Sequence, residues 1–332
     1  MDIVWITESG SIPRGVFRRK NRILEERIVS NFLVAGIVQV ETIVKVAELP
    51  LPYKKLNSGP GTIFTSIGGD AYNTSIALQW LGDKVDFVSM AGSHQNFEVI
   101  ATANKEIVLS TDHVLPILAE TPTAVILYAA DGRQQIHEDI KNIRDAVYDI
   151  NLFTREVEEC DVVVVANANF CRPLLKLAKE KKKPVAVNIR SLNERNKPYN
   201  IDFLQTADII YMSDDDLAED VDRFDYVRDI AREFEPEILV LGCGAQGAIL
   251  YQKKDDSVIR YKTVKTNEIV NSVGAGNALF SCFLHYYYKT GDAREAIKNA
   301  QLFASYKIGY VGTSVGFMTE EQIEQWKEMI YR

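Results

Sequence analysis

The chain has 332 residues, 46% of them hydrophobic and 25% charged, which is typical of a globular protein with one large α/β domain and a small appendage. Its net charge of −8 argues against a nucleic-acid surface as the main function, and no apolar run approaches the roughly 18 residues of a membrane helix. The N-terminus lacks a secretory signal, and the four cysteines lack zinc-site spacing, so we expect a cytoplasmic protein with reduced thiols and no nucleic-acid or membrane partner.

Residues 1–30 form a basic extension ahead of the first clear strand. Its positive charges are Arg14, Arg18, Arg19, Lys20, Arg22 and Arg27. A solvated arm or a surface helix accounts for such a cluster, and binding to nucleic acid or to another subunit is the alternative. We therefore separate residues 1–30 from a principal domain at residues 31–332.

From residue 31 onward, apolar strand-like runs alternate with amphipathic helical stretches. The pattern predicts strands at residues 32–40, 85–91, 161–166, 184–189, 207–212 and 237–241. It predicts helices at residues 71–81, 172–181, 223–234 and 293–308. Such alternation indicates an α/β fold whose mostly parallel sheet is covered on both faces.

Residues 42–67 and 121–138 break this rhythm. They alternate apolar and polar residues around turns such as Asp131-Gly132-Arg133. This pattern predicts antiparallel strands with one face toward solvent.

Several polar positions follow predicted strands. Glu41 follows the first strand, and Gly68-Gly69 opens a helix that carries Asn73. The glycines permit close approach of a ligand, and the asparagine amide can both donate and accept hydrogen bonds. Asn188 and Arg190 end a later strand, where they suit a phosphate or an acidic group.

The acidic run at residues 213–216, Ser-Asp-Asp-Asp, has two readings. Its carboxylates could hold a hydrated Mg²⁺ ion. A serine followed by three acids is equally suited to the N-terminus of a helix, and we favour this cap with a residual metal function.

The segment at residues 270–280 carries the clearest chemical signal. We expect an apolar strand to end near Val270 and an apolar helix to follow a turn containing Gly274 and Gly276. Free N–H groups at the start of a helix favour a phosphate or a developing anion. An aspartate at position 277 could take a proton from a substrate hydroxyl there, but Asn277 cannot, because an amide has no useful basicity.

In this order, the segments resemble the motifs of the ribokinase/PfkB family of carbohydrate kinases across residues 31–330. The motifs are G-x-x-x-x-D ending at Glu41, G-G-x-x-x-N, D-x-N-x-R, N-x-x-E, G-x-x-G and D-T-x-G-A-G-D ending at Asn277. The resemblance implies a three-layer α/β/α sandwich with a mostly parallel sheet and a small antiparallel β lid within residues 42–67 and 121–138.

The resemblance also implies a role for each matched position. Substrate would contact Glu41, Gly68, Gly69, Asn73 and Arg190. ATP would contact Asn188, Gly242, Gly244, Gln246, Gly247, Asn271 and Ser305, and Mg²⁺ would contact Asp214 and Asp216. The anion hole would be Gly274, Ala275 and Gly276, with Asn277 at the position of the catalytic base.

Five positions depart from the family pattern, namely Ala186, Ser213, Gly242, Asn271 and Asn277. The resemblance therefore implies an ATP- and Mg²⁺-dependent kinase that phosphorylates a hydroxyl of a small sugar or sugar derivative, slowed by the missing base. One alternative is a non-catalytic pseudokinase that binds a sugar or a nucleotide. Another is a nucleoside kinase of the same superfamily. The resemblance also suggests a homodimer formed through the lid sheet.

Overall fold

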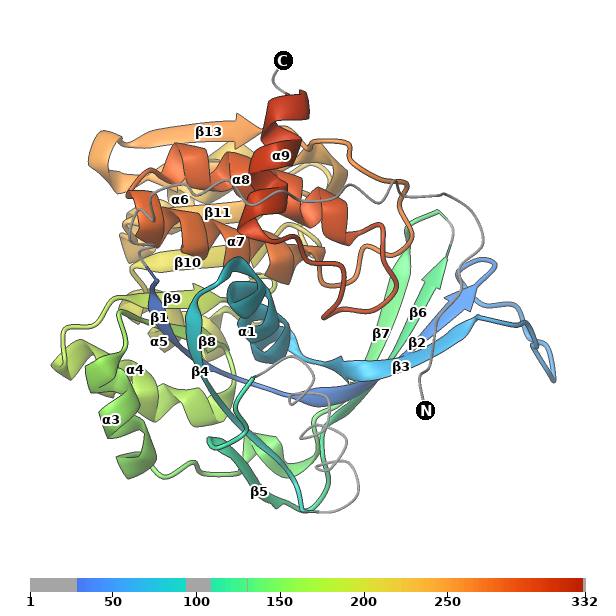
Figure 1. Ribbon diagram of the computed structural model, residues 1–332, viewed down its shortest axis with the longest axis horizontal. Helices are drawn as coiled ribbons and strands as arrows, with labels where there is room; N and C mark the ends of the chain where they lie inside the picture. The colour runs from blue at the N-terminus through green and yellow to red at the C-terminus, as the bar shows by residue number, and fades with distance from the viewer. Residues whose placement is uncertain (1–28, 94–108, 130, 331–332) are drawn as a thin grey trace, which may run out of the picture.

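The computed structural model describes residues 29–93, 109–129 and 131–330 (Figure 1). The basic cluster of the extension lies outside the described residues, so its role and the boundary at residue 30 stay predictions. The strands are β1 (Asn31–Ala35), β2 (Gln39–Val46), β3 (Ile63–Gly68), β4 (Lys84–Gly92), β5 (Val114–Leu118), β6 (Thr123–Ala129), β7 (Gln134–Asp139), β8 (Val162–Ala166), β9 (Val185–Asn188), β10 (Ile209–Ser213), β11 (Ile238–Gly242), β12 (Ala248–Gln252) and β13 (Ser257–Tyr261). The α-helices are α1 (Asp70–Leu81), α3 (Asn151–Glu159), α4 (Arg172–Glu180), α5 (Lys197–Thr206), α6 (Arg223–Phe234), α7 (Ala275–Thr290), α8 (Ala293–Lys307) and α9 (Glu320–Ile330).

A large sheet forms the centre of the molecule, with strand order β13-β12-β11-β10-β9-β8-β1-β4-β5. Neighbouring strands from β5 to β11 run parallel, and β12 and β13 add antiparallel strands at one edge. The four consecutive valines of β8 suit this place, because β-branched residues favour strands and a strand covered on both faces needs apolar side chains in both directions.

Helices cover both faces of this sheet, and alternate residues of each strand pack into different layers. In β1, Phe32 and Val34 join a core with side chains of α1, α7, α8 and α9. Leu33 and Ala35 join a second core with side chains of α3, α4, α5 and α6. The expected three-layer α/β/α fold is therefore confirmed (Figure 1).

A small lid sheet projects from the main sheet, with strand order β3-β2-β6-β7 (Figure 1). It consists of two antiparallel pairs, β2 with β3 and β6 with β7, joined by parallel pairing between β2 and β6. These strands fall within or next to the two stretches whose alternating pattern predicted a lid.

Three local expectations were wrong. The strand expected at residues 32–40 divides, because β1 ends at Ala35 and the chain crosses into the lid before β2 begins at Gln39. The sequence gives no sign of this bend, because β1, the bend and the start of β2 form one continuous and largely buried apolar run. Val270 does not end a strand; it lies in the loop between β13 and α7, where its N–H donates to the Ile308 carbonyl (2.8 Å).

The third error concerns the acidic run after β10. Residues 214–217 form a turn, closed by the Leu217 N–H donating to the Asp214 carbonyl (3.0 Å), and no helix begins there. Helix α6 begins at Arg223, and its N-cap is Asp222, whose carboxylate accepts from the N–H groups of Phe224 and Asp225. A short acidic residue just before the periodic segment was the better cap signal.

No helix in the described part of the chain is both long enough and apolar enough to cross a membrane. The four cysteines are buried free thiols.

Candidate active site

The candidate residues meet at the carboxyl edge of the main sheet. Asn188, Ser213 and Gly242 are the last residues of the neighbouring strands β9, β10 and β11. The first turns of α1 and α7 reach the same place, where Asp70 of α1 contacts Asn277 of α7. Ligands of open α/β sheets bind at this edge.

The turn before α7 presents free backbone N–H groups. Gly274 has a φ of 81°, and a Cβ at this position would press against the Thr313 carbonyl, so the turn requires glycine. The Ala275 N–H donates to the Ser272 carbonyl (3.1 Å). Within the described residues, the N–H groups of Gly274 and Gly276 make no hydrogen bond, so these two can bind an anion at the positive end of α7.

Asn277 is buried in a chain of directed hydrogen bonds. Its Nδ2 donates to Asp70 Oδ1 (3.0 Å), and its Oδ1 accepts from Asn188 Nδ2 (2.8 Å). Asn188 Oδ1 in turn accepts from the Arg190 N–H (3.1 Å). An ionised carboxylate only accepts hydrogen bonds, so Asp70 fixes which way the amide of Asn277 points. The position predicted for a base therefore holds a donor aimed at a neighbouring acid.

Asp70 is the functional candidate that the sequence reasoning missed. It is the first residue of α1 and it is exposed, unlike the two glycines before it. The available signal was a carboxylate inside the glycine motif, directly before the helix. Its proximity to Asn277 could not be inferred, because the two residues lie 207 positions apart.

Glu41 of lid strand β2 is buried, with 3% of its surface exposed. Its Oε1 accepts from Gln39 Nε2 and from the Gly69 N–H (both 3.0 Å), and its Oε2 accepts from the Thr313 hydroxyl. Burial raises the pKa of Glu41 despite these three hydrogen bonds. Glu41 thus connects β2 to the loops on both sides of the site, and its direct contact with substrate stays a prediction.

Gly68 is required by Glu41. A Cβ at position 68 would overlap the Glu41 carboxyl group, which packs against the backbone at the end of β3. In the first turn of α1, Asn73 is buried, and its Oδ1 has no hydrogen-bond partner among the described residues. An unpaired buried acceptor fits a donor supplied by a ligand.

Glu138 of β7 and exposed Arg190 are close enough for their charges to interact. The pKa of Glu138 is raised, because surrounding protein atoms displace water and because Asp70 and Glu41 repel its charge. Arg190 and a hydrogen bond with Gln39 oppose this rise. Three carboxylates, those of Glu41, Asp70 and Glu138, therefore share this region with one guanidinium.

The turn after β11 runs close to the start of α7. Gly244, Gln246 and Gly247 form a tight reversal, in which the Cys243 N–H donates to the Gly247 carbonyl (2.8 Å). The side chain of Gln246 points to Arg260, whose Nη1 donates to its Oε1 (2.7 Å). The N–H groups of Gln246 and Gly247 also bond within the turn, to the carbonyls of Cys243 (2.9 Å) and Gly244 (3.1 Å). Contact of this turn with ATP stays a prediction.

Asn271 and Ser305 hold the loop that leads into α7. Asn271 is buried, and its Oδ1 accepts from the Val273 N–H (3.0 Å). The Ser305 hydroxyl of α8 contacts Thr266 Oγ1 (3.1 Å) and donates to the Val264 carbonyl. Both residues shape the loop in this structure, and their contact with ATP stays a prediction.

The pfkB family carbohydrate kinase model matches residues 30–320, which is most of the chain. The chain belongs to this family. Deoxyribokinases of Salmonella typhi and Salmonella typhimurium are each 31% identical to it over 109 residues, covering 32% of this chain and 35% of each relative. The chain therefore matches about a third of the length of these curated relatives.

Solved structures of PfkB-type kinases share the fold. A microbiome-derived acarbose kinase superposes with a TM-score of 0.75 at 22% identity, covering 90% of this chain and 98% of the other. An Arabidopsis thaliana ribokinase complexed with ribose and ATP superposes with a TM-score of 0.74 at 16% identity, with the same coverage. The expected family and ribokinase-like fold are confirmed.

PfkB kinases are expected to use Mg²⁺, but the predicted metal ligands are engaged by other groups. Asp214 Oδ2 pairs with Arg223 Nε (3.1 Å), and Asp216 accepts from the Ser191 hydroxyl. Among the described residues, no group of three potential ligands is arranged to hold a metal ion. The metal role of Asp214 and Asp216 stays a prediction.

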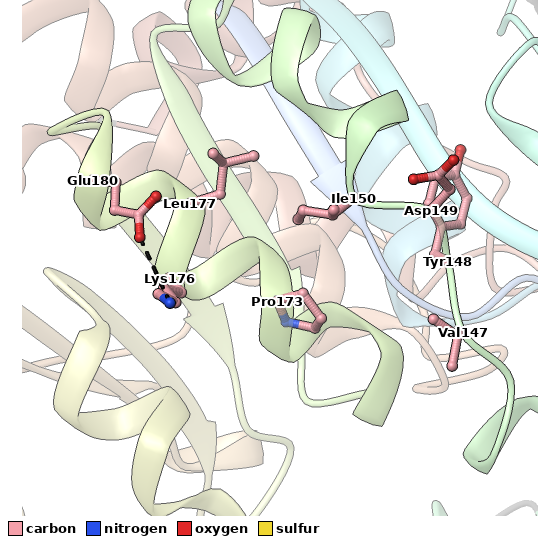
Figure 2. Close-up of a pocket in the computed structure, with 8 residues that line it drawn as sticks. All are labelled: Val147, Tyr148, Asp149, Ile150, Pro173, Lys176, Leu177 and Glu180. Carbon is pink, nitrogen blue, oxygen red and sulfur yellow. Dashed lines mark ion pairs between the residues drawn. The ribbon is translucent and has the colours of Figure 1, made fainter.

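A surface hollow of about 630 Å³ lies elsewhere in this PfkB-type fold (Figure 2). It is lined by residues 147–150 and by side chains of α4, where Lys176 and Glu180 form an ion pair (3.9 Å). None of its lining residues belongs to the elements that carry the candidate site.

Proposed function

We propose that this protein is a carbohydrate kinase that transfers the γ-phosphoryl group of MgATP to a hydroxyl of a small, neutral sugar or sugar derivative. The observation that carries the proposal is the convergence of two helix starts. The free N–H groups of Gly274 and Gly276 lie in the same cluster as Asn277, Asp70 and Asn188. Phosphoryl transfer depends mainly on positioning and on stabilising charge, which such a cluster provides.

The charges at the site favour a neutral acceptor. An anionic sugar would meet the carboxylates of Asp70 and Glu138, while the charge of Arg190 is partly balanced by Glu138. Hydroxyl groups can instead donate to carboxylates and accept from Arg190 and Asn73. Because the curated relatives carry the name deoxyribokinase, 2-deoxy-D-ribose is the first acceptor to test.

Asn277 itself cannot take the proton of the acceptor hydroxyl. General-base assistance typically contributes about 10²–10⁴-fold to a rate. A kinase that relied on position 277 alone would therefore be slow.

A sugar- or nucleotide-binding pseudokinase is the second candidate. The observation in its favour is that Arg223 already pairs with one oxygen of Asp214 and the Ser191 hydroxyl already donates to one oxygen of Asp216. Such a protein would bind its ligands without transferring phosphate.

Turnover of MgATP with 2-deoxy-D-ribose, D-ribose, D-fructose, D-gluconate and inosine separates these functions. We expect a phosphorylated neutral sugar in mass spectra and ADP in equal amount. Phosphorylation of inosine alone would instead identify a nucleoside kinase. Calorimetric binding of ATP and a sugar without any transfer would support the pseudokinase.

We also propose that the chain works in the cytoplasm as a homodimer joined through its lid sheet. The four buried free thiols support a reducing compartment. Exposed apolar side chains on the lid, including Ile63 and Val125, support the dimer.

A further inference from the structure

We infer that Asp70 is the catalytic base of this kinase, in place of the aspartate that position 277 lacks. This inference rests on the proposed kinase function and assigns a chemical role to Asp70, the first variable position of the G-G-x-x-x-N motif. The deciding geometry is the contact between Asp70 Oδ1 and Asn277 Nδ2 (3.0 Å). The acid lies one hydrogen bond away from the position where the base is expected.

The surrounding hydrogen bonds keep Asp70 in place and leave part of it free. Asn277 is held from its other side by Asn188 (2.8 Å), so its NH₂ group is aimed at Asp70 Oδ1. Among the described residues, Asp70 Oδ2 accepts no hydrogen bond, and Asp70 is exposed. A substrate hydroxyl can therefore reach one carboxylate oxygen while the amide of Asn277 orients the other.

The other two carboxylates of the site are less suited to this role. Glu41 is 3% exposed, and both of its oxygens accept from protein donors. Glu138 lies on lid strand β7 and interacts with Gln39 and Arg190, whereas Asp70 directly contacts the first turn of α7. Of the three, Asp70 alone combines exposure with contact to the helix that carries the anion hole.

Phosphoryl transfer forms one P–O bond and breaks another. Asp70 accepts the proton of the acceptor hydroxyl, and the hydroxyl oxygen forms a bond to the γ-phosphorus of ATP. The bond between the γ-phosphorus and the β–γ bridging oxygen breaks, and ADP leaves with the electron pair. The free N–H groups of Gly274 and Gly276 donate to the phosphoryl oxygens during transfer, and Asp70 releases its proton to water afterwards.

This arrangement also explains why position 277 carries an amide. An aspartate at position 277 would place a second carboxylate about 3.0 Å from Asp70, and two like charges that close oppose each other's ionisation. Restoring the family acid by Asn277→Asp alone should therefore not raise kcat. The informative change is an exchange of acid and amide between the two positions.

The test compares the native chain with Asp70→Asn, Asn277→Asp and the double variant Asp70→Asn/Asn277→Asp. Each is assayed with MgATP and 2-deoxy-D-ribose, D-ribose or D-fructose. We expect Asp70→Asn to lower kcat by about 10²–10⁴-fold, the usual contribution of a general base, with little change in the KM for ATP. The double variant should recover most of that loss. Asp225→Asn, a first-turn aspartate of α6, is the matched control and should leave kcat unchanged.

Several results would overturn the inference. They are an Asp70→Asn variant with native kcat, a double variant no better than Asp70→Asn, or an Asn277→Asp variant much faster than the native chain. In each case phosphoryl transfer is still seen, so the proposed kinase function survives. Absence of transfer in every chain, with folding verified by thermal melting, would reject both proposals.

Discussion

The hydroxyl of Tyr211 lies between the end of β11 and the start of α7. A Cβ atom built on Gly242 would lie 2.9 Å from the Tyr211 hydroxyl oxygen, and a Cβ atom built on Gly276 would lie 2.6 Å from it. Burial raises the pKa of Tyr211, with smaller contributions from nearby carboxylates, so the phenol keeps its proton and can donate. We therefore expect the Tyr211 hydroxyl to donate to a phosphate group of ATP at the point where Gly242 has no side chain.

We predict that Tyr211→Phe weakens the use of ATP. A hydrogen bond to a charged group is worth about 1.5–3 kcal/mol, so kcat/KM for ATP should fall roughly 10- to 100-fold. The melting temperature should change little, because phenylalanine keeps the stacking on Phe280 (ring centroids 5.3 Å apart).

Tyr226→Phe is the matched control for this prediction. Its hydroxyl donates to the Leu192 carbonyl (2.9 Å), so its loss should lower the melting temperature and leave kcat/KM intact. Equal kinetics for Tyr211→Phe and the native chain would contradict a phosphate contact.

Lys307 is fully buried under the loop that leads into α7. Its Nζ donates to the Val273 carbonyl, one residue before Gly274. Burial lowers the pKa of Lys307 to about 7, although the charge of Glu41 acts in the opposite direction. In the unfolded chain a lysine keeps its proton up to about pH 10.4.

We predict that this lysine makes the native chain more stable as pH rises from about 7 toward 10. Over that window unfolding takes up a proton, because only the unfolded lysine is protonated, and raising the pH disfavours that uptake. The free energy of unfolding in urea, measured at pH 7 and at pH 9.5, should therefore rise more for the native chain than for Lys307→Met. Parallel pH profiles for the two chains would show that Lys307 is not titrating in this window.

At the scale of elements, a buried charge cluster joins three helices. His285 of α7 contacts Asp83, which follows the C-cap of α1 (Nδ1 to Oδ2, 2.8 Å), and Glu320 at the start of α9 (Nε2 to Oε1, 3.7 Å). Burial alone would lower the pKa of His285, but its two acidic partners outweigh burial and raise it. Contacts with His285 and Lys289 lower the pKa of Glu320 to about 2.

We predict that His285→Gln destabilises the fold more at pH 6 than at pH 9. A histidine with a raised pKa contributes its full stabilisation below the unfolded value of about 6.5, and this contribution is lost as pH rises through the folded pKa. Thermal melts of both chains at the two pH values measure the difference. A penalty that is equal at pH 6 and pH 9 would mean that the histidine is neutral in the fold.

Most strands of the main sheet were predictable, because they carry their own apolar patterns, whereas β5, β12 and β13 at its edges were not predicted. Helix α6 and the valine strand β8 are examples in which local sequence and final structure agree closely. The bend at residues 36–38 was hidden, since hydropathy records burial and not the sheet into which a strand is placed.

The motif residues could be located along the chain, but their partners could not. The hydroxyl of Thr313, which belongs to none of the motifs, donates to Glu41, 272 positions away on the lid side. Asp70 and Asn277 are separated by a similar distance in sequence. An acid missing from a motif can be replaced by an acid on any neighbouring element. Motif matching therefore detects the missing acid more readily than the residue that takes over its role.

At the scale of the whole molecule, the lid sheet has two unlike faces. Its inner face supplies Gln39, Glu41 and Glu138 to the site, and Ile43 packs there with Val273 of the anion-hole loop. Its outer face carries an apolar patch, which we define as Val44, Ile63, Val125 and Leu127, on neighbouring strands in register. The connection between β2 and β3 exposes further large apolar side chains, with Tyr53 at 94% and Leu56 at 79%.

We predict that this outer patch joins two copies of the chain. Ile63 and Val125 are 67% and 42% exposed in one chain, and covering such a patch is favourable. In a two-fold dimer each substituted residue occurs on both sides of the interface, so Ile63→Lys/Val125→Lys would place like charges against each other. Light scattering should give twice the mass of the chain for the native protein and the mass of one chain for the variant.

The control for this prediction is a double substitution of equal charge on the surface hollow, Val147→Lys/Ile150→Lys, which should leave the mass doubled. Both variants should keep the native far-ultraviolet circular dichroism, because all four positions are at least a third exposed in the single chain. A native protein that scatters as a single chain at micromolar concentration would contradict the dimer. In that event the outer patch would need another partner.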